Sequence, residues 1–153
     1  YDLEIPDFGR AKLALSGVVL TSSAAAARVT PAADPHLVDA MPAPPSTARS
    51  FDRAETLAVY AEAYHGRGNS DPTVRLRTRV QGATTRQTLV DLTDDRQSGG
   101  ASGSQATHAV TATIPLKDLE PGPYVLRVDV TSTNNGDTVF REVPFEVASA
   151  TRP

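Results

Sequence analysis

The residues with the widest chemical range in this chain are its three histidines, His36, His65 and His108. They lie far apart in sequence, and none has another histidine two or four positions away, the spacings that align ligands on a strand or a helix. His36 lies in a long loop and His65 begins a turn, so both are expected to be solvated. His108 is in phase with an apolar strand face and is expected at a strand end. A zinc site needs at least three converging ligands, so we predict no metal at the histidines.

A second candidate for metal chemistry is the carboxylate cluster Asp91, Asp94 and Asp95, close to Gly99 and Gly100. Calcium loops supply oxygen ligands at alternating positions, in an Asp-x-Asp-x-Asp-Gly arrangement that wraps the backbone around the ion. The cluster lacks this alternation. Calcium therefore stays open as a disfavoured alternative, and the sequence predicts no cofactor.

No arrangement of nucleophiles indicates catalysis. The chain has no cysteine, which removes thiol nucleophiles, disulfides and thiolate metal sites. Its serines lie in no Gly-x-Ser-x-Gly turn, and no glycine-rich phosphate loop precedes a helix. We therefore predict that the chain is not an enzyme.

Charge and hydropathy exclude two classes of partner. The net charge of −3 argues against nucleic acid, because binding to phosphates needs a basic surface. No run of residues approaches the roughly 18 apolar positions that a membrane span requires. The sequence therefore predicts a partner that is neither nucleic acid nor bilayer.

Three arginines form a stripe at alternating positions, Arg75, Arg77 and Arg79. This arginine stripe could bind acidic glycans or carboxylates of a partner. The favoured alternative is a solvent-facing strand surface that is neutralised across strands, for instance by Glu62 or Asp129. The stripe is therefore a candidate interaction surface whose simplest explanation is internal pairing.

These residues must be positioned by β-strands, because alternation of apolar and polar residues is the dominant pattern. Glu55 to Tyr64 is apolar on both faces, which predicts a strand that is central in its sheet or has one face covered by a loop. Asn134 to Asp137 predicts a hairpin with a type I′ turn at Asn-Gly. The other expected strands are 1–5, 13–20 with an irregularity at Gly17, 73–80, 86–92, 107–114, 124–130 and 138–147.

A Pro-Gly turn precedes one of these strands and involves Pro121, Gly122 and Tyr124. Pro121 presets its backbone angle for a turn, and Gly122 supplies conformational freedom. A tyrosine directly after such a turn is typical of the tyrosine corner of immunoglobulin-like sandwiches, in which the ring packs inward and the hydroxyl bonds to upstream backbone. The turn is therefore a predicted structural corner with no chemistry of its own.

Residues 1–153 are expected to form a single β-sandwich domain. Residues 22–50 form a long Ala/Pro-rich crossover, either pinned to the sandwich by Leu37 and Met41 or docked on a neighbour, which makes both residues candidates for an interaction surface. Residues 93–106 are expected to form a flexible Gly/Ser-rich loop. The predicted fold is all-β: an immunoglobulin-like or fibronectin-III-like antiparallel sandwich of about seven or eight strands.

Three stretches together carry a family resemblance: 6–8 with 13–22, 42–64, and 114–119 with 121–128. In this order they resemble the C-terminal region of large bacterial proteins that carry a von Willebrand factor A-related domain and are abundant in Acidobacteria. The resemblance implies an exported protein, periplasmic, on the cell surface or extracellular, with the A-type domain upstream. The Asp-x-Ser-x-Ser metal loop of A-type domains does not occur here, so no functional residue is carried over.

The expected function is a non-catalytic immunoglobulin-like module for protein–protein contact, self-association or assembly. β-strand addition is one route, with 22–50 or the strand at 1–5 adding to the sheet edge of a neighbour. The alternative is a carbohydrate-binding sandwich. Sugar sites present exposed aromatic platforms, whereas this chain has no tryptophan and four tyrosines, so protein contact is favoured over glycan binding.

Overall fold

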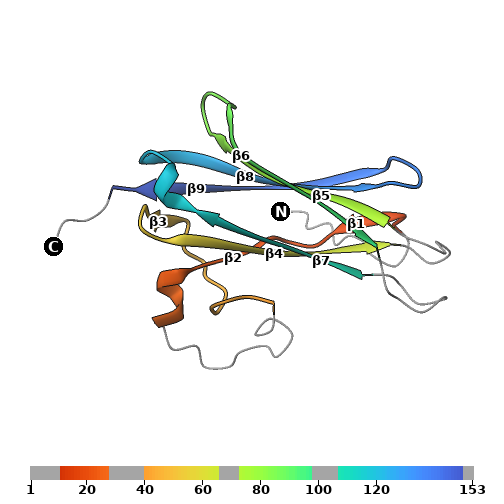
Figure 1. Cartoon of the computed structure of the whole chain (residues 1–153), viewed down its shortest axis with the longest axis horizontal. Coiled ribbons are helices and arrows are strands. Elements are labelled where there is room, and N and C mark those ends of the chain that lie inside the picture. The colour runs from red at the N-terminus through yellow and green to blue at the C-terminus, as the bar shows by residue number, and fades with distance from the viewer. Residues whose placement is uncertain (1–10, 28–39, 66–72, 98–106, 150–153) are drawn as a thin grey trace, which may run out of the picture.

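The computed structural model describes residues 11–27, 40–65, 73–97 and 107–149. They form nine strands and two short 3-10 helices that stack as two sheets (Figure 1). In chain order the elements are β1 (Leu13–Leu15), β2 (Val19–Ser22), η1 (Ser23–Ala27), β3 (Ser50–Asp52), β4 (Thr56–His65), β5 (Thr73–Gly82), β6 (Thr88–Gln97), β7 (Thr107–Pro115), η2 (Leu116–Asp118), β8 (Gly122–Ser132) and β9 (Thr138–Ala148).

The first sheet is built around β4, which pairs with β7 along one edge. The short strands β1 and β2 pair with successive parts of its other edge. This confirms the prediction that β4 is central. Its inward residues Leu57 and Val59 are buried, and Ala58 and Tyr60 on the opposite face are buried as well, as the apolar content of both faces predicts.

The second sheet has five strands in the order β3-β9-β8-β5-β6. Its β9-β8-β5 order corresponds to the GFC sheet of immunoglobulin domains. All its pairs are antiparallel except β3 with β9, which is parallel. The predicted β-sandwich is therefore confirmed, with one mixed sheet in place of two purely antiparallel ones.

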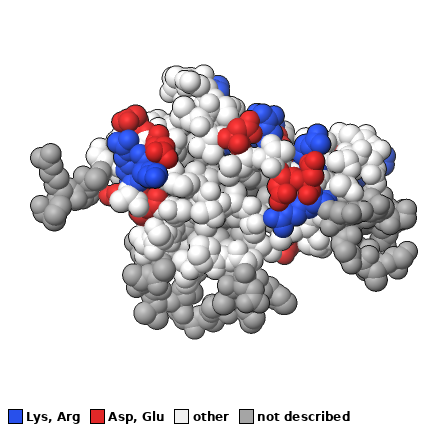
Figure 2. Space-filling model, in the orientation of Figure 1, with Lys and Arg blue, Asp and Glu red and all other residues white. Residues whose placement is uncertain are grey.

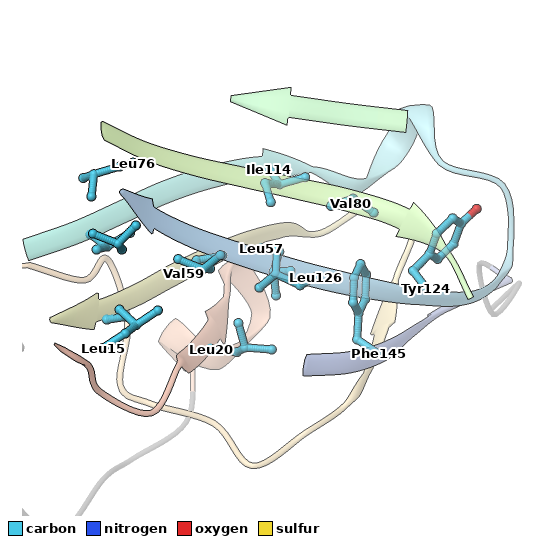
Figure 3. Close-up of a cluster of buried hydrophobic side chains, with 14 of the residues drawn as sticks. Leu15, Leu20, Leu57, Val59, Leu76, Val80, Ile114, Tyr124, Leu126 and Phe145 are labelled. Carbon is cyan, nitrogen blue, oxygen red and sulfur yellow. The ribbon is translucent and has the colours of Figure 1, made fainter. Parts of the chain in front are cut away.

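The core lies between the two sheets, and alternate residues of facing strands fill it (Figure 3). On β5 the residues predicted to point inward are all buried: Val74, Leu76, Thr78 and Val80. At one end of the core the rings of Tyr124 and Phe145 stack with their centroids 5.7 Å apart. The period of two along β5 is thus sufficient to assign its buried face.

The strand count exceeds the predicted seven or eight for two reasons. The stretch from Leu13 to Leu20 is two strands, because the register on β4 shifts by one residue between Leu15, opposite Ala63, and Val19, opposite Tyr60. A strand also forms around Phe51, which is 2% exposed and pairs with β9. The weak strand expected at 1–5 lies outside the described residues.

The prediction of a flexible loop over 93–106 is wrong in its first part. Residues 93–97 belong to β6 and pair with β5. Arg75 and Arg77 on β5 form ion pairs with Asp95 and Asp91 on β6. These cross-strand partners hold in a strand polar residues whose composition is typical of a loop. The rest of the segment, 98–106, lies outside the described residues.

Described parts of the 22–50 crossover pack on this domain. Ser46 donates its N–H to the carbonyl oxygen of Leu20 at 2.8 Å, and the Thr21 hydroxyl donates to the carbonyl of Pro44 at 2.6 Å. The sequence makes Met41 a candidate for an interaction surface, but its side chain is buried at 6% exposure. Leu37 lies outside the described residues.

The β8–β9 hairpin forms where Asn-Gly predicts it, but its turn is not type I′. β8 ends at Ser132 and β9 begins at Thr138. Gly136 has a φ of 74°, whereas Asn135 is not among the non-glycine residues with positive φ in the described chain. A type I′ turn needs positive φ at both central residues, so the longer loop places only the glycine in that region.

The corner before β8 has the geometry expected of a tyrosine corner. Tyr124 is 7% exposed, and its hydroxyl donates to the carbonyl oxygen of Glu120 at 2.6 Å. Gly122 has a φ of 153°, which side chains with a Cβ rarely adopt. The turn and the ring together determine how the chain enters β8.

Replacement of Tyr124 by Phe should lower the free energy of unfolding by about 1 kcal/mol, the net contribution of one hydrogen bond. The ring and its stacking on Phe145 are retained, so the change isolates the hydroxyl. Urea denaturation would show a lower midpoint with an unchanged slope. An unchanged midpoint would contradict a stabilising role for this hydrogen bond.

Candidate functional site

The two sheets differ in width on one side of the sandwich. β7 is an edge of the first sheet and β6 an edge of the second, and β7 lies against both β5 and β6. A hollow of about 220 Å³ opens between the edge strands β6 and β7. We call this hollow the β6–β7 groove; it is lined by Leu76, Thr78, Leu92, Thr93, Asp94, Val110, Thr111, Ala112 and Thr113.

β6 lies beyond β7, the edge strand of the opposite sheet, so no strand of the described chain covers its inner face. Leu92 is directly opposite Thr78 and Asp94 is opposite Leu76, and opposite residues point to the same face of a sheet. Thr78 and Leu76 face the core, so Leu92 and Asp94 point to the inner side as well. Leu92 is nevertheless 41% exposed. The first sheet therefore lacks a strand next to β7 and beneath β6.

One backbone hydrogen bond shows which peptide groups of β7 point toward its open edge. Leu116 donates its N–H to the carbonyl of Glu55 at 3.1 Å, so the peptide groups of Leu116 point toward β4. Residues that face the partner alternate along an antiparallel strand. The peptide groups of Ala109, Thr111 and Thr113 therefore face away from β4, toward the open edge.

Pro115, at the end of β7, has the same orientation, and there its missing N–H removes no ladder bond. Proline is tolerated at such an edge position for this reason.

The two edge strands differ in charge. β7 contains no Asp, Glu, Lys or Arg over its nine residues. β6 carries three aspartates and one arginine, and Asp94 and Arg96 both occupy inward positions. Charges at an edge, and inward charges above all, discourage pairing with another strand. β7 is thus the edge of this pair without such protection.

The arginine stripe is paired internally on the outer face of the second sheet. Arg75 contacts Asp95 at 2.8 Å, Arg77 contacts Asp91 at 2.6 Å, and Arg79 contacts Asp129 at 2.7 Å. The Arg77 guanidinium, hydrogen-bonded to Asp91, lowers the pKa of that carboxyl. Figure 2 shows positive and negative side chains side by side in mixed clusters, so no unbalanced cationic surface remains on this stripe.

Of the two carboxylates expected to neutralise the stripe, Asp129 does so and Glu62 does not. Glu62 lies in the other sheet, where it accepts hydrogen bonds from the hydroxyls of Tyr60 and Tyr64. The bond to Glu62, with burial, raises the pKa of Tyr64 to about 12. The strand order separates Glu62 from the arginines, and this order is not apparent from the spacing of residues.

Asp129 is the centre of the most enclosed ion-pair network. Its side chain is 12% exposed and accepts from Arg79 at 2.7 Å and from Arg127 at 2.8 Å. Arg127 also reaches Glu142 at 3.0 Å and lies 3.8 Å from the ring centroid of Phe140. Phe140 is the exposed aromatic residue of the described chain, at 48%, and this guanidinium lies over one face of its ring.

Two of the histidines meet inside the sandwich. His65, at the end of β4, is 1% exposed, and His108, on β7, is 4% exposed. Their ring centroids are 5.5 Å apart in an edge-to-face arrangement. The prediction that His65 is solvated is therefore wrong, because β7 pairs with β4 over its whole length and brings distant residues together. His36 lies outside the described residues.

Burial acts on both histidines in the same direction. It lowers the pKa of His65. It also lowers the pKa of His108, with further contributions from the positive charges of His65 and of Arg96 on β6. Both rings are therefore stabilised in the neutral form, and each added proton works against the packed end of the sandwich.

The remaining sequence candidates do not converge on a cation. Asp91 and Asp95 are bound to arginines of β5, and Asp94 is bound to Arg96. Among residues 11–27, 40–65, 73–97 and 107–149, no group of three or more His, Cys, Asp or Glu could hold a metal ion. The described part of the chain also has no helix that is long and apolar enough to cross a membrane.

Sequence reasoning missed the β6–β7 groove and the histidine pair. A weak signal for the groove exists, since the strand 107–115 has no charge, unlike the other long strands. No signal could have located the histidine pair, because contact between residues 65 and 108 depends on the pairing of β4 with β7.

No family model matches the sequence, and neither does any curated protein. Among solved structures, the chain is similar to a beta-glucosidase from Listeria innocua in complex with glucose. The two are 16% identical with a TM-score of 0.38, over 87% of this chain and 16% of the enzyme. The chain thus corresponds to a small part of that enzyme's length, and a similarity at this level carries no argument about activity.

Replacement of Asp129 by Asn should lower the free energy of unfolding by about 2 kcal/mol, because two guanidinium groups lose a charged acceptor in a mostly enclosed site. The matched control is Asp95→Asn, whose exposed ion pair with Arg75 should give no measurable change. Urea denaturation of both variants makes the comparison. Equal effects would contradict the special position of Asp129.

Acidification should destabilise the fold through His65 and His108. Both pKa values are lower in the folded chain than in the unfolded chain, where histidine titrates near pH 6.5. Below about pH 6.5 the unfolded chain therefore binds more protons, and the free energy of unfolding falls, by at most about 1.4 kcal/mol per pH unit for each histidine.

Urea denaturation at about pH 7.5 and about pH 5.5 measures this dependence above the range in which carboxylates titrate. The single variants His65→Gln and His108→Gln should each reduce the pH dependence, since glutamine stays neutral. A pH dependence that neither variant reduces would show that other groups are responsible.

Proposed function

We propose that this chain is a non-catalytic immunoglobulin-like module that mediates protein–protein contact by β-strand addition. The free edge of β7 is the acceptor, and an extended segment of a partner protein is the ligand. The observation that carries the proposal is the uncharged nine-residue edge, with peptide groups of Ala109, Thr111 and Thr113 directed outward. An edge strand of this length without protective charges is a template for pairing.

This assignment reverses the direction of strand addition expected from the sequence. From the sequence, the 22–50 crossover or the strand at 1–5 is expected to add to the sheet edge of a neighbour, and 1–5 lies outside the described residues. The crossover can be compared with this expectation. Its described residues are engaged in their own domain, as Thr21 with Pro44 and Leu20 with Ser46 illustrate. The same module is better suited to accept a strand than to donate this one.

The physical basis of binding would be main-chain hydrogen bonds. An added strand would satisfy outward N–H and C=O groups of β7, and each bond contributes about 0.5–1.5 kcal/mol net. Main-chain bonds supply affinity with little sequence preference, which comes instead from pockets for alternate side chains. The same proposal places the protein outside the cytoplasm, supported by the resemblance to exported bacterial proteins.

A proline substitution at Thr111 should abolish this contact without unfolding the domain. The N–H of Thr111 faces the open edge, so proline removes a bond to the partner and none to β4. The matched control is Thr88→Pro on β6, which does not line the groove. The carbonyl of Gln87 accepts from the N–H of Gly82 on β5, so the peptide groups of the next residue, Thr88, face the outer edge of β6.

The measurement is selection of binders from a random peptide library displayed on phage, followed by binding assays with both variants. Selected peptides should bind the Thr111→Pro variant about tenfold or more weakly, and the Thr88→Pro variant normally. Circular dichroism checks that both variants are folded. A library without binders, or binders that ignore Thr111→Pro, would overturn the proposal.

A further inference from the structure

We infer that the strand position beside β7 takes a single extended segment with short, uncharged apolar side chains facing inward. This inference rests on the proposed function and specifies its partner. Three observations carry it: the lining of the β6–β7 groove, the overhang of β6 and the internal pairing of the charges of β6.

The groove is adapted to short apolar side chains. Its walls combine the inward surfaces of Leu76, Leu92, Val110 and Ala112. Alternate residues of an added strand would point into it, because side chains of a strand alternate between faces. Its volume of about 220 Å³ is below the 300–1,000 Å³ typical of small-molecule sites. Side chains of valine or alanine size fit this space better than a large ring does.

The overhang of β6 excludes a second copy of the sandwich as the occupant. Two copies joined through their β7 edges would form one continuous sheet about a two-fold axis perpendicular to it. The second sheets of both copies would then lie on the same side of that sheet. Because β6 extends over the seam in each copy, the two β6 strands would occupy the same space. One strand fits beneath β6, and a second sandwich does not.

Charge determines which side chains can face the groove. Asp91 and Asp95 of β6 point to the outer face, where they pair with Arg77 and Arg75. The inward Asp94 and Arg96 pair with each other at 2.7 Å, and β7 has no charge. The described residues of the groove thus offer no unpaired charge to an added strand, so a charged side chain directed into it would lose solvation without gaining a partner.

The test uses three synthetic nine-residue peptides: valine alternating with lysine, glutamate alternating with lysine, and tryptophan alternating with lysine. Fluorescence anisotropy measures binding to the whole chain. The valine–lysine peptide should bind at least tenfold more tightly than either of the others. Equal binding of the glutamate–lysine peptide would overturn the argument that apolar side chains face inward, and equal binding of the tryptophan peptide would overturn the size argument.

Two leucines of β6 give a matched pair of variants. Leu92 lines the groove and Leu89 does not, although both are exposed, at 41% and 47%. Leu92→Glu should weaken the valine–lysine peptide at least tenfold relative to Leu89→Glu, which adds the same charge to the same strand. Equal affinities of the two variants would overturn the groove as the binding site.

These outcomes separate the inference from the proposed function. If Thr111→Pro weakens binding of the peptide and Leu92→Glu does not, strand addition at β7 is supported and the role of the groove is contradicted. If Thr111→Pro does not weaken binding, strand addition itself is contradicted. Light scattering completes the test: one chain per peptide is expected, and a chain dimer that Thr111→Pro disrupts would overturn the single-segment occupant.

Discussion

The pairing of β6 with β5 is the constraint on which the candidate site depends. β6 buries almost none of its own side chains, so it stays in the sheet through its backbone ladder and through the ion pairs that Arg75 and Arg77 make with Asp95 and Asp91. Exposed ion pairs of this kind contribute little to stability. Their consequence here is positional, because they hold a polar strand beyond the edge of the opposite sheet and so leave a strand position open beside β7.

The rest of the sandwich keeps this edge in place. β4 is paired on both edges and buried on both faces, so β7 is anchored along its length. At the far end of the core, Tyr124 and Phe145 stack and the corner directs β8 into the sheet. The outer face of the second sheet is covered by paired charges around Asp129. Under the proposed function, a partner strand would add at β7, the long edge strand of the described chain that carries no charge.

The histidine pair makes the packing of β7 depend on the protonation of His65 and His108. His108 is a residue of β7, and its contact with His65 joins β7 to its neighbour β4. Two neutral imidazoles pack well there, whereas an imidazolium would lose solvation in a buried place. β7 is consequently held by two groups whose pKa values burial lowers and whose protonation opposes its packing.

The sequence by itself determined the all-β class, the inward residues of β5 and β8, the central place of β4 and the position of the corner. These features are local: an alternation of period two or a Pro-Gly turn acts within a few residues. The tertiary structure alone decided which strands are edges, that Glu62 and the arginines lie on different sheets, that residues 93–97 extend β6, and that His65 meets His108. The physical reason is that strand order and register arise from contacts between residues far apart in the chain, such as Arg77 with Asp129 or Ala63 with His108. The same alternating pattern along β7 is compatible with a central strand or an open edge, and only the arrangement of its neighbours distinguishes the two.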